Sequence, residues 1–265
     1  MEKKRLIDEA NDKNIIREMS MGGSGGNLPK WLLEDTSGVR YYAKGRSKQG
    51  SLEPEAEICA CKLAELFGVP AIEYELVNMP ELSNQPVCLC KDYSNGIKVM
   101  SLYRYVQGVT GKNPATIMNG REKLDLVSSV LTKKDAELHI SILFLDYIVG
   151  NRDRHLRNFD VRVDINGNLL DLVPMFDTGD SLFASENETS IYRANLAGNN
   201  FIQSKPYHNP HYAQAKLLKE AGYSPLLNPV DKESIYRTIN SCFTGNRAKL
   251  LNQFVVLNAG RLGLL

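Results

Sequence analysis

The chain has 265 residues, of which 43% are hydrophobic and 24% charged, and its formal net charge is +1. This is the composition of an ordinary globular protein, long enough for one large domain or two lobes. The balanced charge argues against direct binding to nucleic acid or to a membrane surface. No apolar run approaches the ~18 residues of a membrane span. The opening MEKKRLIDEANDKN has no apolar core and is not expected to be a secretion signal.

The five cysteines include two Cys-x-Cys pairs, at 59/61 and 88/90. These pairs lack the further Cys or His spacing of a zinc site. We therefore expect buried free thiols, which favour a reducing compartment and a cytoplasmic location, although secretion as an effector stays open.

The first part of the chain is predicted to be β-rich. Residues 1–20 are polar and indicate a helix or a loose arm, and 21–30 form a glycine-rich turn. The strand-like segments 31–35 and 39–45, separated by a turn at Gly38, predict a hairpin.

A helix is expected next, starting near Pro54 and ending at Gly68. Proline suits a first helical turn, and the acids Glu55 and Glu57 suit the positive end of the helix dipole. Its apolar face would consist of Ile58, Cys61, Leu63, Leu66 and Phe67. Two strands should follow, at 71–78 and 86–93.

The remainder has mainly helical patterns, interrupted by two strand-like segments around the turn Asn166-Gly167. This succession predicts an α+β, bilobal fold. A β-rich N-lobe would span 1–93 and a mainly helical C-lobe 94–265, with a cleft near 90–100. The expected helices lie at 101–108, 121–132, 136–150, 211–222 and 231–257, and the strand-like segments at 159–164 and 168–177.

The segment NRDRHLRNFD at 151–160 follows one of the most apolar parts of the chain and carries the pattern Asp-x4-Asn. In protein kinases this spacing places a catalytic base and a magnesium ligand in one loop, here Asp153 and Asn158. Asp177, in PMFDTGD, would be the second metal ligand. Two alternatives stay open: a simple turn at 177–179, or one half of an aspartic-protease pair.

Lys44 lies on the strand after the glycine-rich turn, where a lysine can reach nucleotide phosphates and be oriented by a helix acid. Only one of Glu57 and Glu55 can be that acid, because they face different directions. Lys44 could instead be a surface lysine. The turn could cradle phosphates or simply be flexible, and it is not a Walker A loop. The candidate phosphate-binding residues of the turn are Gly22, Gly23, Ser24, Gly25 and Gly26.

Together these motifs resemble the HipA-like serine/threonine kinases, a bacterial toxin-kinase family. NRDRHLRN is similar to that family's N-x-D-R-H-x-K-N loop, with Arg157 in place of the common lysine. VPMFDTGDS, SGGNLPKWLL and EAEICACKLAELFGVP are similar to its metal-binding, glycine-loop and helix segments, and the last alignment favours Glu57. CKDY resembles its hinge, which implies that the backbone near Lys91 and Tyr93 binds adenine. The resemblance covers roughly 20–180, and the tail matches no motif of the family.

The resemblance implies a protein-kinase-like bilobal fold and an ATP- and Mg²⁺-dependent kinase acting on Ser/Thr hydroxyls of an unidentified protein substrate. It also implies autophosphorylation of a glycine-loop serine, here Ser20 or Ser24, and a small DNA-binding, antitoxin-like partner. Because little chain precedes the glycine loop, a compact form of the CtkA type is expected. His155 would stabilise the catalytic loop beside bound nucleotide, and arginines 152, 154 and 157 would offset substrate or phosphate charge. A small-molecule or lipid kinase, and an ATP-binding pseudokinase, remain alternatives.

Overall fold

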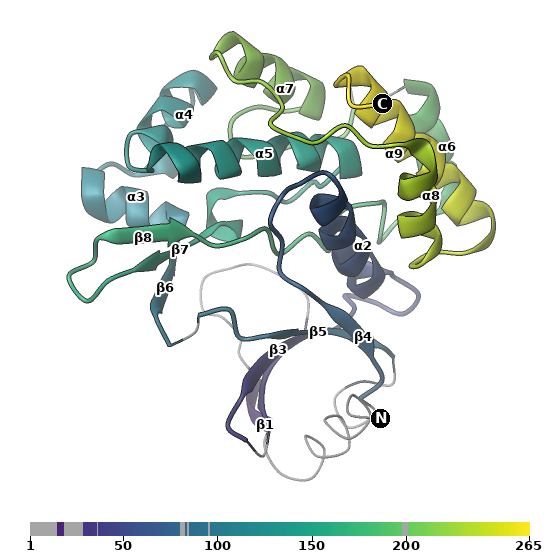
Figure 1. The fold of residues 1–265 in the computed structure, drawn as a ribbon, viewed down its shortest axis with the longest axis horizontal. Helices are drawn as coiled ribbons and strands as arrows, with labels where there is room; N and C mark the ends of the chain where they lie inside the picture. Colours follow the sequence, from purple (N-terminus) through teal and green to yellow (C-terminus); the bar gives the residue numbers. More distant parts are fainter. Residues whose placement is uncertain are drawn as a thin grey trace.

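The computed structural model describes residues 15–18, 29–35, 37–79, 83, 85–94, 96–197 and 201–265, with the backbone only at 15–18. A β-sheet occupies one end of the molecule and a group of helices the other, as Figure 1 shows. This is the bilobal α+β architecture that the sequence predicts. The expected lobe boundary at 93/94 stays a prediction.

The sheet at the N-terminal end has five antiparallel strands in the order β1-β2-β3-β5-β4. The predicted hairpin is present as β2 and β3, and Gly38 has the positive φ of 81° that its turn requires. Of residues 1–20, for which a helix or arm was expected, only 15–18 are described, and they form a strand. The expected strand at 71–78 shortens to three residues. The strands are β1 (Ile15–Glu18), β2 (Lys30–Glu34), β3 (Arg40–Lys44), β4 (Glu75–Val77) and β5 (Val87–Lys91).

Helix α2 (Glu53–Leu66) lies between this sheet and the helical part (Figure 1). Proline is its second residue, and Gly68 just beyond its end has φ of 80°. The helix is covered from both sides, and ten of its fourteen residues are buried. Because α2 is covered by both parts of the molecule, its side chains have fixed positions relative to each of them.

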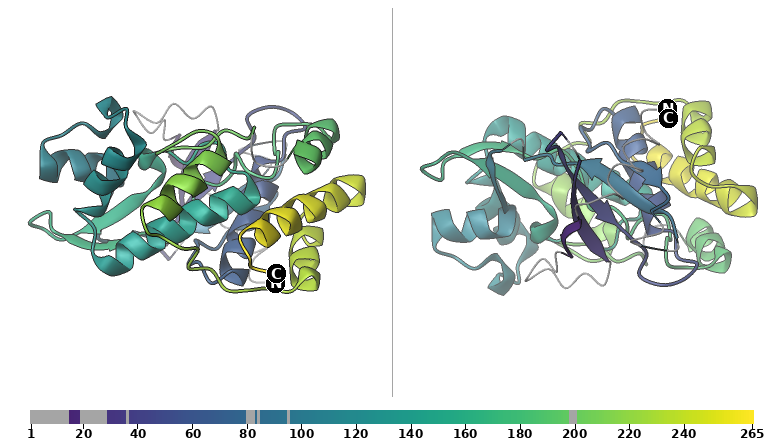
Figure 2. Two further views of the ribbon diagram at one scale, coloured as in Figure 1. Left: turned by 90° about the horizontal axis from the view of Figure 1, so that it is seen from above. Right: turned by 90° about the horizontal axis from the view of Figure 1, so that it is seen from below.

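The helical part is built around α5 (Lys133–Val149), whose residues from His139 onward are all buried. Seen from above, α5, α7 and α9 lie across the top of the molecule (Figure 2). The helix expected at 231–257 is divided into two helices by a break at 241–244. The other helices are α3 (Leu102–Thr110), α4 (Gly120–Ser128), α6 (Glu188–Ala197), α7 (His211–Glu220), α8 (Lys232–Asn240) and α9 (Gly245–Arg261).

A second, three-stranded antiparallel sheet lies beside α3, in the order β6 (Lys98–Ser101), β7 (Asp160–Val163), β8 (Leu169–Leu172). The short 3-10 helix at Leu156–Asn158 joins the end of α5 to β7. Thus the segment 151–158 is fixed at both ends, by a buried helix and by a paired strand.

The five cysteines are free, and four of them are buried, as the sequence predicts. Among the described residues no helix is both long and apolar enough to cross a membrane.

Candidate active site

One cavity of about 360 Å³ brings together residues that are far apart in the sequence. Four of the predicted site residues, Lys44, Tyr93, Asn158 and Asp177, line it. They come from β3, the segment after β5, the catalytic-loop segment and the segment after β8. The sequence predicts these residues from separate motifs, and the fold places them around one space.

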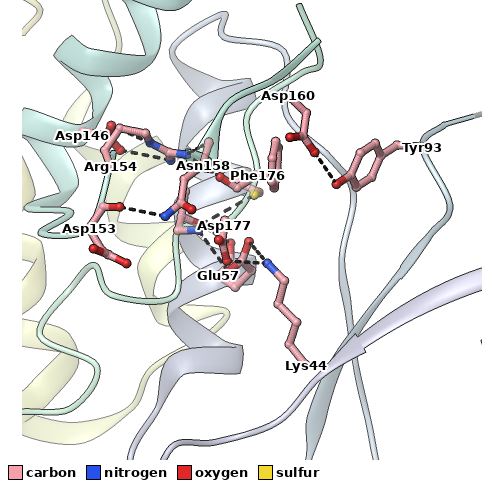
Figure 3. A network of polar contacts seen from close by, with 12 residues as sticks. Lys44, Glu57, Tyr93, Asp146, Asp153, Arg154, Asn158, Asp160, Phe176 and Asp177 are labelled. Atoms are coloured by element: carbon pink, nitrogen blue, oxygen red, sulfur yellow. Dashed lines mark hydrogen bonds and ion pairs between the residues drawn. The ribbon is translucent and has the colours of Figure 1, made fainter. Parts of the chain in front are cut away.

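Lys44 is the centre of an ion-pair network, drawn in Figure 3. Its Nζ lies 3.3 Å from Glu57 Oε1 and 2.9 Å from Asp177 Oδ1. Lys44 is only 8% exposed, so the alternative of a surface lysine is wrong. Burial alone lowers the pKa of Lys44, but the carboxylates of Asp177 and Glu57 outweigh it, and the net shift is upward. The lysine is therefore a fixed positive charge at the cavity wall.

The structure decides between the two candidate helix acids. Glu57 is 1% exposed, and its second carboxylate oxygen accepts a 3.0 Å hydrogen bond from the backbone N–H of Thr178. Glu55 instead forms an ion pair with Arg46. The predicted pairing of Lys44 with Glu57 is confirmed, and Glu57 also ties α2 to the segment that carries Asp177.

The two candidate metal ligands offer oxygen atoms at the cavity wall. Asn158 donates its Nδ2 to the carbonyl of Asp153 at 2.7 Å, which leaves the amide Oδ1 available as an acceptor. Burial raises the pKa of the Asp177 carboxyl, but Lys44, Lys30 and Arg154 together hold it well below its usual range. An ionised carboxylate and an amide oxygen are the donors that Mg²⁺ takes from proteins, so these residues fit that ion.

The backbone of Asp177 supports the same interpretation. Its φ is +56°, an uncommon conformation for a residue other than glycine, and such residues occur at functional sites more often than elsewhere. The plain-turn alternative does not account for a partly buried carboxylate paired with Lys44.

Arg154, expected to offset substrate charge, is instead buried, with 1% exposure. Its Nε lies 2.8 Å from Asp146 Oδ2, and its Nη1 donates to the carbonyl oxygens of Asn158 and Phe176 at 2.8 and 2.6 Å. One guanidinium thereby fixes the distance between the segments that hold Asn158 and Asp177. The expectation that Arg154 offsets substrate charge is wrong, because its guanidinium donates hydrogen bonds to acceptors inside the protein and does not face a ligand.

The other two arginines also have partners in the protein. Arg152 forms ion pairs with Asp180 and Glu186. Arg157 lines the cavity and stacks over the ring of Tyr103, with 4.3 Å from its Cζ to the ring centroid.

Asp153, the predicted base, follows the buried end of α5. Its backbone N–H donates to Asn151 Oδ1 at 3.1 Å, while its side chain is 44% exposed. Oδ1 lies 2.7 Å from Lys205 Nζ, and Oδ2 lies 3.8 Å from His155 Nε2. The backbone of Asp153 is thus fixed, and its carbonyl accepts the hydrogen bond from Asn158. The carboxylate points outward, and Asp153 is not among the residues that line the cavity.

No known protein family matches the sequence of this chain, and no curated protein is similar to it in sequence. Solved structures do match. The kinase CtkA of Helicobacter pylori superposes with a TM-score of 0.68 at 16% identity, over 91% of this chain and 90% of that one. HipA of Shewanella oneidensis MR-1, solved with HipB and operator DNA, superposes with a TM-score of 0.53 at 11% identity, over 98% of this chain and 71% of that one.

The chain has the fold of these HipA- and CtkA-like kinases. The resemblance inferred from the catalytic-loop and metal-ligand motifs is therefore confirmed at the level of structure.

Several predicted residues of this kinase-like site stay predictions. Gly22, Gly23, Ser24, Gly25, Gly26 and Ser20 lie outside the described residues. Lys91 is exposed at the end of β5, and its predicted role involves only its backbone. His155 is half-buried, and burial lowers the pKa of its imidazole.

The aromatic end of the cavity contains residues that the sequence did not indicate. The ring of Tyr93 lies 5.7 Å from that of Tyr42 and 5.3 Å from that of Phe176, centroid to centroid. The Tyr93 hydroxyl donates to Asp160 at 3.1 Å, and burial raises the pKa of that carboxyl to about 6. A flat apolar ligand group would fit against these rings. The alternation of side chains along a strand could have predicted on which face of its sheet Tyr42 or Asp160 lies. It could not have predicted that both residues line the same cavity.

Proposed function

We propose that this chain is a protein kinase that transfers the γ-phosphoryl group of ATP to a Ser or Thr hydroxyl. The observation that carries the proposal is the ion-pair chain Glu57–Lys44–Asp177, which joins α2 to the metal-ligand segment at the wall of one cavity. Active protein kinases require a lysine–glutamate pair and a metal-binding aspartate together.

Each residue then has one role. Lys44 binds phosphate oxygens, and Glu57 keeps its ammonium group directed into the cavity. Asn158 and Asp177 would hold Mg²⁺, which neutralises phosphate charge when bound. Asp153 accepts the proton of the attacking hydroxyl. A bond forms between that oxygen and the γ-phosphorus, the bond from this phosphorus to the bridging oxygen breaks, and ADP leaves with the electron pair.

The aromatic end of the cavity fits the nucleoside. Tyr42, Tyr93 and Phe176 offer ring faces for adenine, and the backbone near Lys91 and Tyr93 would bind its edge. The glycines 22, 23, 25 and 26, with Ser24, would approach the phosphates, and His155 would support the catalytic loop. Autophosphorylation of Ser20 or Ser24 belongs to the same proposal. It can be detected by mass spectrometry of protein that has been incubated with ATP.

A partner and a location complete the proposal. The HipA structure was solved with HipB and operator DNA, so a small DNA-binding, antitoxin-like protein is the partner we propose. Four buried free thiols support a reducing, cytoplasmic environment. Co-expression with the product of a neighbouring small gene, followed by size-exclusion chromatography, tests the partner directly.

The kinase proposal is tested by Asp153→Asn, which keeps the size of the side chain but cannot accept the proton. Base catalysis contributes typically 10²–10⁴-fold, so the rate of phosphoryl transfer to casein should fall at least ~100-fold. The affinity for ADP and the melting temperature should change little, because a base acts mainly in the transition state.

Three results would count against the proposed protein kinase. Activity retained together with a lower melting temperature would make Asp153 a structural residue. Nucleotide binding without transfer by the wild-type chain, to casein or to itself, would favour the pseudokinase alternative. Transfer to small alcohols but not to proteins would favour a small-molecule kinase.

A further inference from the structure

The carboxylate of Asp153 has a partner that comes from a distant part of the chain. Lys205 Nζ lies 2.7 Å from Asp153 Oδ1, although the two residues are 52 positions apart. Lys205 belongs to the irregular segment 201–210 between α6 and α7. An exposed ion pair of this kind contributes little to stability, so a stabilising role alone does not explain why the two residues meet.

The segment that carries Lys205 is anchored to the catalytic loop and to α5. Just beyond the segment, His211 Nε2 lies 2.7 Å from the carbonyl oxygen of Asn151, two residues before Asp153. The hydroxyl of Tyr207 lies 2.7 Å from Nε2 of His139, a buried residue of α5. The chain just after Lys205 is thus anchored, and the half-exposed side chain of Lys205 reaches Asp153 from this anchored segment.

The hydrogen bonds inside the segment reinforce this placement. Ser204 Oγ donates to the carbonyl of His208 at 2.6 Å, and the N–H of Tyr207 donates to Gln214 Oε1 at 3.0 Å. Lys123 of α4 donates to the carbonyl of Pro206 at 3.3 Å. The backbone on both sides of Lys205 therefore has partners in the fold.

Three other cations near Asp153 and Asp177 already pair with acids, while Lys30, Arg104 and Arg157 line the cavity itself. Arg154 is buried against Asp146, Arg152 pairs with Asp180 and Glu186, and Lys44 pairs with Glu57 and Asp177. Within the described part of the chain, Asp153 is the acid with which Lys205 pairs. The ammonium group of Lys205 is half-exposed beside Asp153, so a ligand that carries negative charge could compete with Asp153 for it.

We propose that Lys205 is a further catalytic residue, whose ammonium group turns from Asp153 to the γ-phosphoryl group when nucleotide and substrate bind. The inference rests on the proposed kinase function. In phosphoryl transfer the charge of the transferred group is spread over its three equatorial oxygens, and a positive group placed next to them stabilises the transition state. Lys205 stays protonated throughout, and the hydroxyl proton goes to Asp153.

The test compares Lys205→Met with wild type in two measurements. Calorimetry gives the affinity for Mg-ADP and for a non-hydrolysable Mg-ATP analogue, which differ in the γ-phosphoryl group. We expect unchanged ADP affinity and roughly tenfold weaker binding of the analogue, as for loss of one charge-assisted hydrogen bond. The rate of transfer to casein should fall about 100-fold, as when one such donor is removed, and Lys205→Arg should restore part of it.

Lys216→Met is the matched control, because Lys216 is an exposed lysine of the neighbouring α7 that pairs with Glu220 at 3.7 Å. It should behave as wild type in every measurement. Equal losses of ADP and analogue affinity in Lys205→Met, or an unchanged rate, would overturn the proposal. A higher rate would show that the Lys205–Asp153 pair is a brake. Failure of the wild type to bind either nucleotide would overturn the kinase function itself, and with it the role of Lys205.

Discussion

Lys44 and Glu57 lie on different secondary-structure elements, and their side chains meet at 3.3 Å in a buried position. The same glutamate accepts the backbone N–H of Thr178 at 3.0 Å, and the same lysine lies 2.9 Å from Asp177. Three segments are thus connected by two side chains. If α2 moved, both Lys44 and Asp177 would lose a contact that fixes their positions.

The first prediction concerns that glutamate. Glu57→Gln keeps an acceptor for Thr178 but removes the charge that orients Lys44. We expect Mg-ADP affinity to fall about tenfold, the loss expected for one hydrogen bond to a charged group. Glu55→Gln, which affects only the ion pair with Arg46, is the control and should bind as wild type. Calorimetry of both variants measures the difference, and equal behaviour of the two would contradict the assignment.

Asp177 is the subject of the second prediction. Asp177→Ala removes a carboxylate at the cavity wall, so the increase in ADP affinity caused by Mg²⁺ should be lost while the fold persists. Binding is measured with Mg²⁺ and with EDTA. Asp180→Asn is the control, because Asp180 pairs with Arg152 and has no proposed role at the metal. An unchanged effect of Mg²⁺ in Asp177→Ala would mean that the ion binds elsewhere.

The site residues that the sequence predicts, and whose positions the structure now describes, share one property: each comes from a motif with characteristic local spacing. Asp153 and Asn158 are close in one loop, and Lys44 and Glu57 belong to consecutive elements. Lys205 could not be predicted in this way, because its contact with Asp153 depends on how the segment after α6 folds back over α5. The tail of the chain shows no motif, so its contribution to the site was invisible in the sequence.

Arg154 illustrates a different limit of prediction from the sequence. Six of the ten residues at 151–160 are Arg, His or Asp, and such a run favours an exposed loop. The structure shows the opposite for one of them, since Asp146 at the buried end of α5 supplies the partner. The single acid that interrupts the apolar run of α5 was a signal for a buried cation. The sequence alone did not indicate which of the three arginines would pair with it.

The third prediction follows from that pair. Arg154→Met leaves Asp146 as a buried charge without its partner, and breaking such a pair costs about 3–5 kcal/mol. The free energy of unfolding, measured in urea, should fall by that amount. Arg157→Met is the control, because exposed Arg157 only stacks on Tyr103 and should cost about 1 kcal/mol or less. Similar losses in the two variants would mean that the burial of Arg154 has little energetic weight.

The fourth prediction concerns His211, which anchors the segment of Lys205 to the catalytic loop. The side chain is 1% exposed, and burial lowers its pKa from 6.5 to about 4, although Asp146 partly opposes the shift. In the neutral ring Nε2–H donates to the carbonyl of Asn151 at 2.7 Å. Because the unfolded chain binds the proton at a higher pH than the folded one, the contribution of His211 to stability is complete above pH 6.5. It is lost as the pH falls toward 4.

The size of this effect is up to about 3 kcal/mol, since each pKa unit corresponds to about 1.4 kcal/mol. His211→Gln retains an N–H that can donate to Asn151 but does not titrate in this range. The unfolding free energy of wild type, measured in urea at pH 7.5, 6, 5 and 4.5, should therefore fall more steeply than that of the variant. His139, whose pKa burial lowers to about 3, is present in both proteins, so the difference between the two curves isolates His211. Parallel curves would mean that His211 remains neutral in the unfolded chain as well, or that its ring is accessible to protons in the folded one. In either case His211 would not be a pH-sensitive anchor of the segment that carries Lys205.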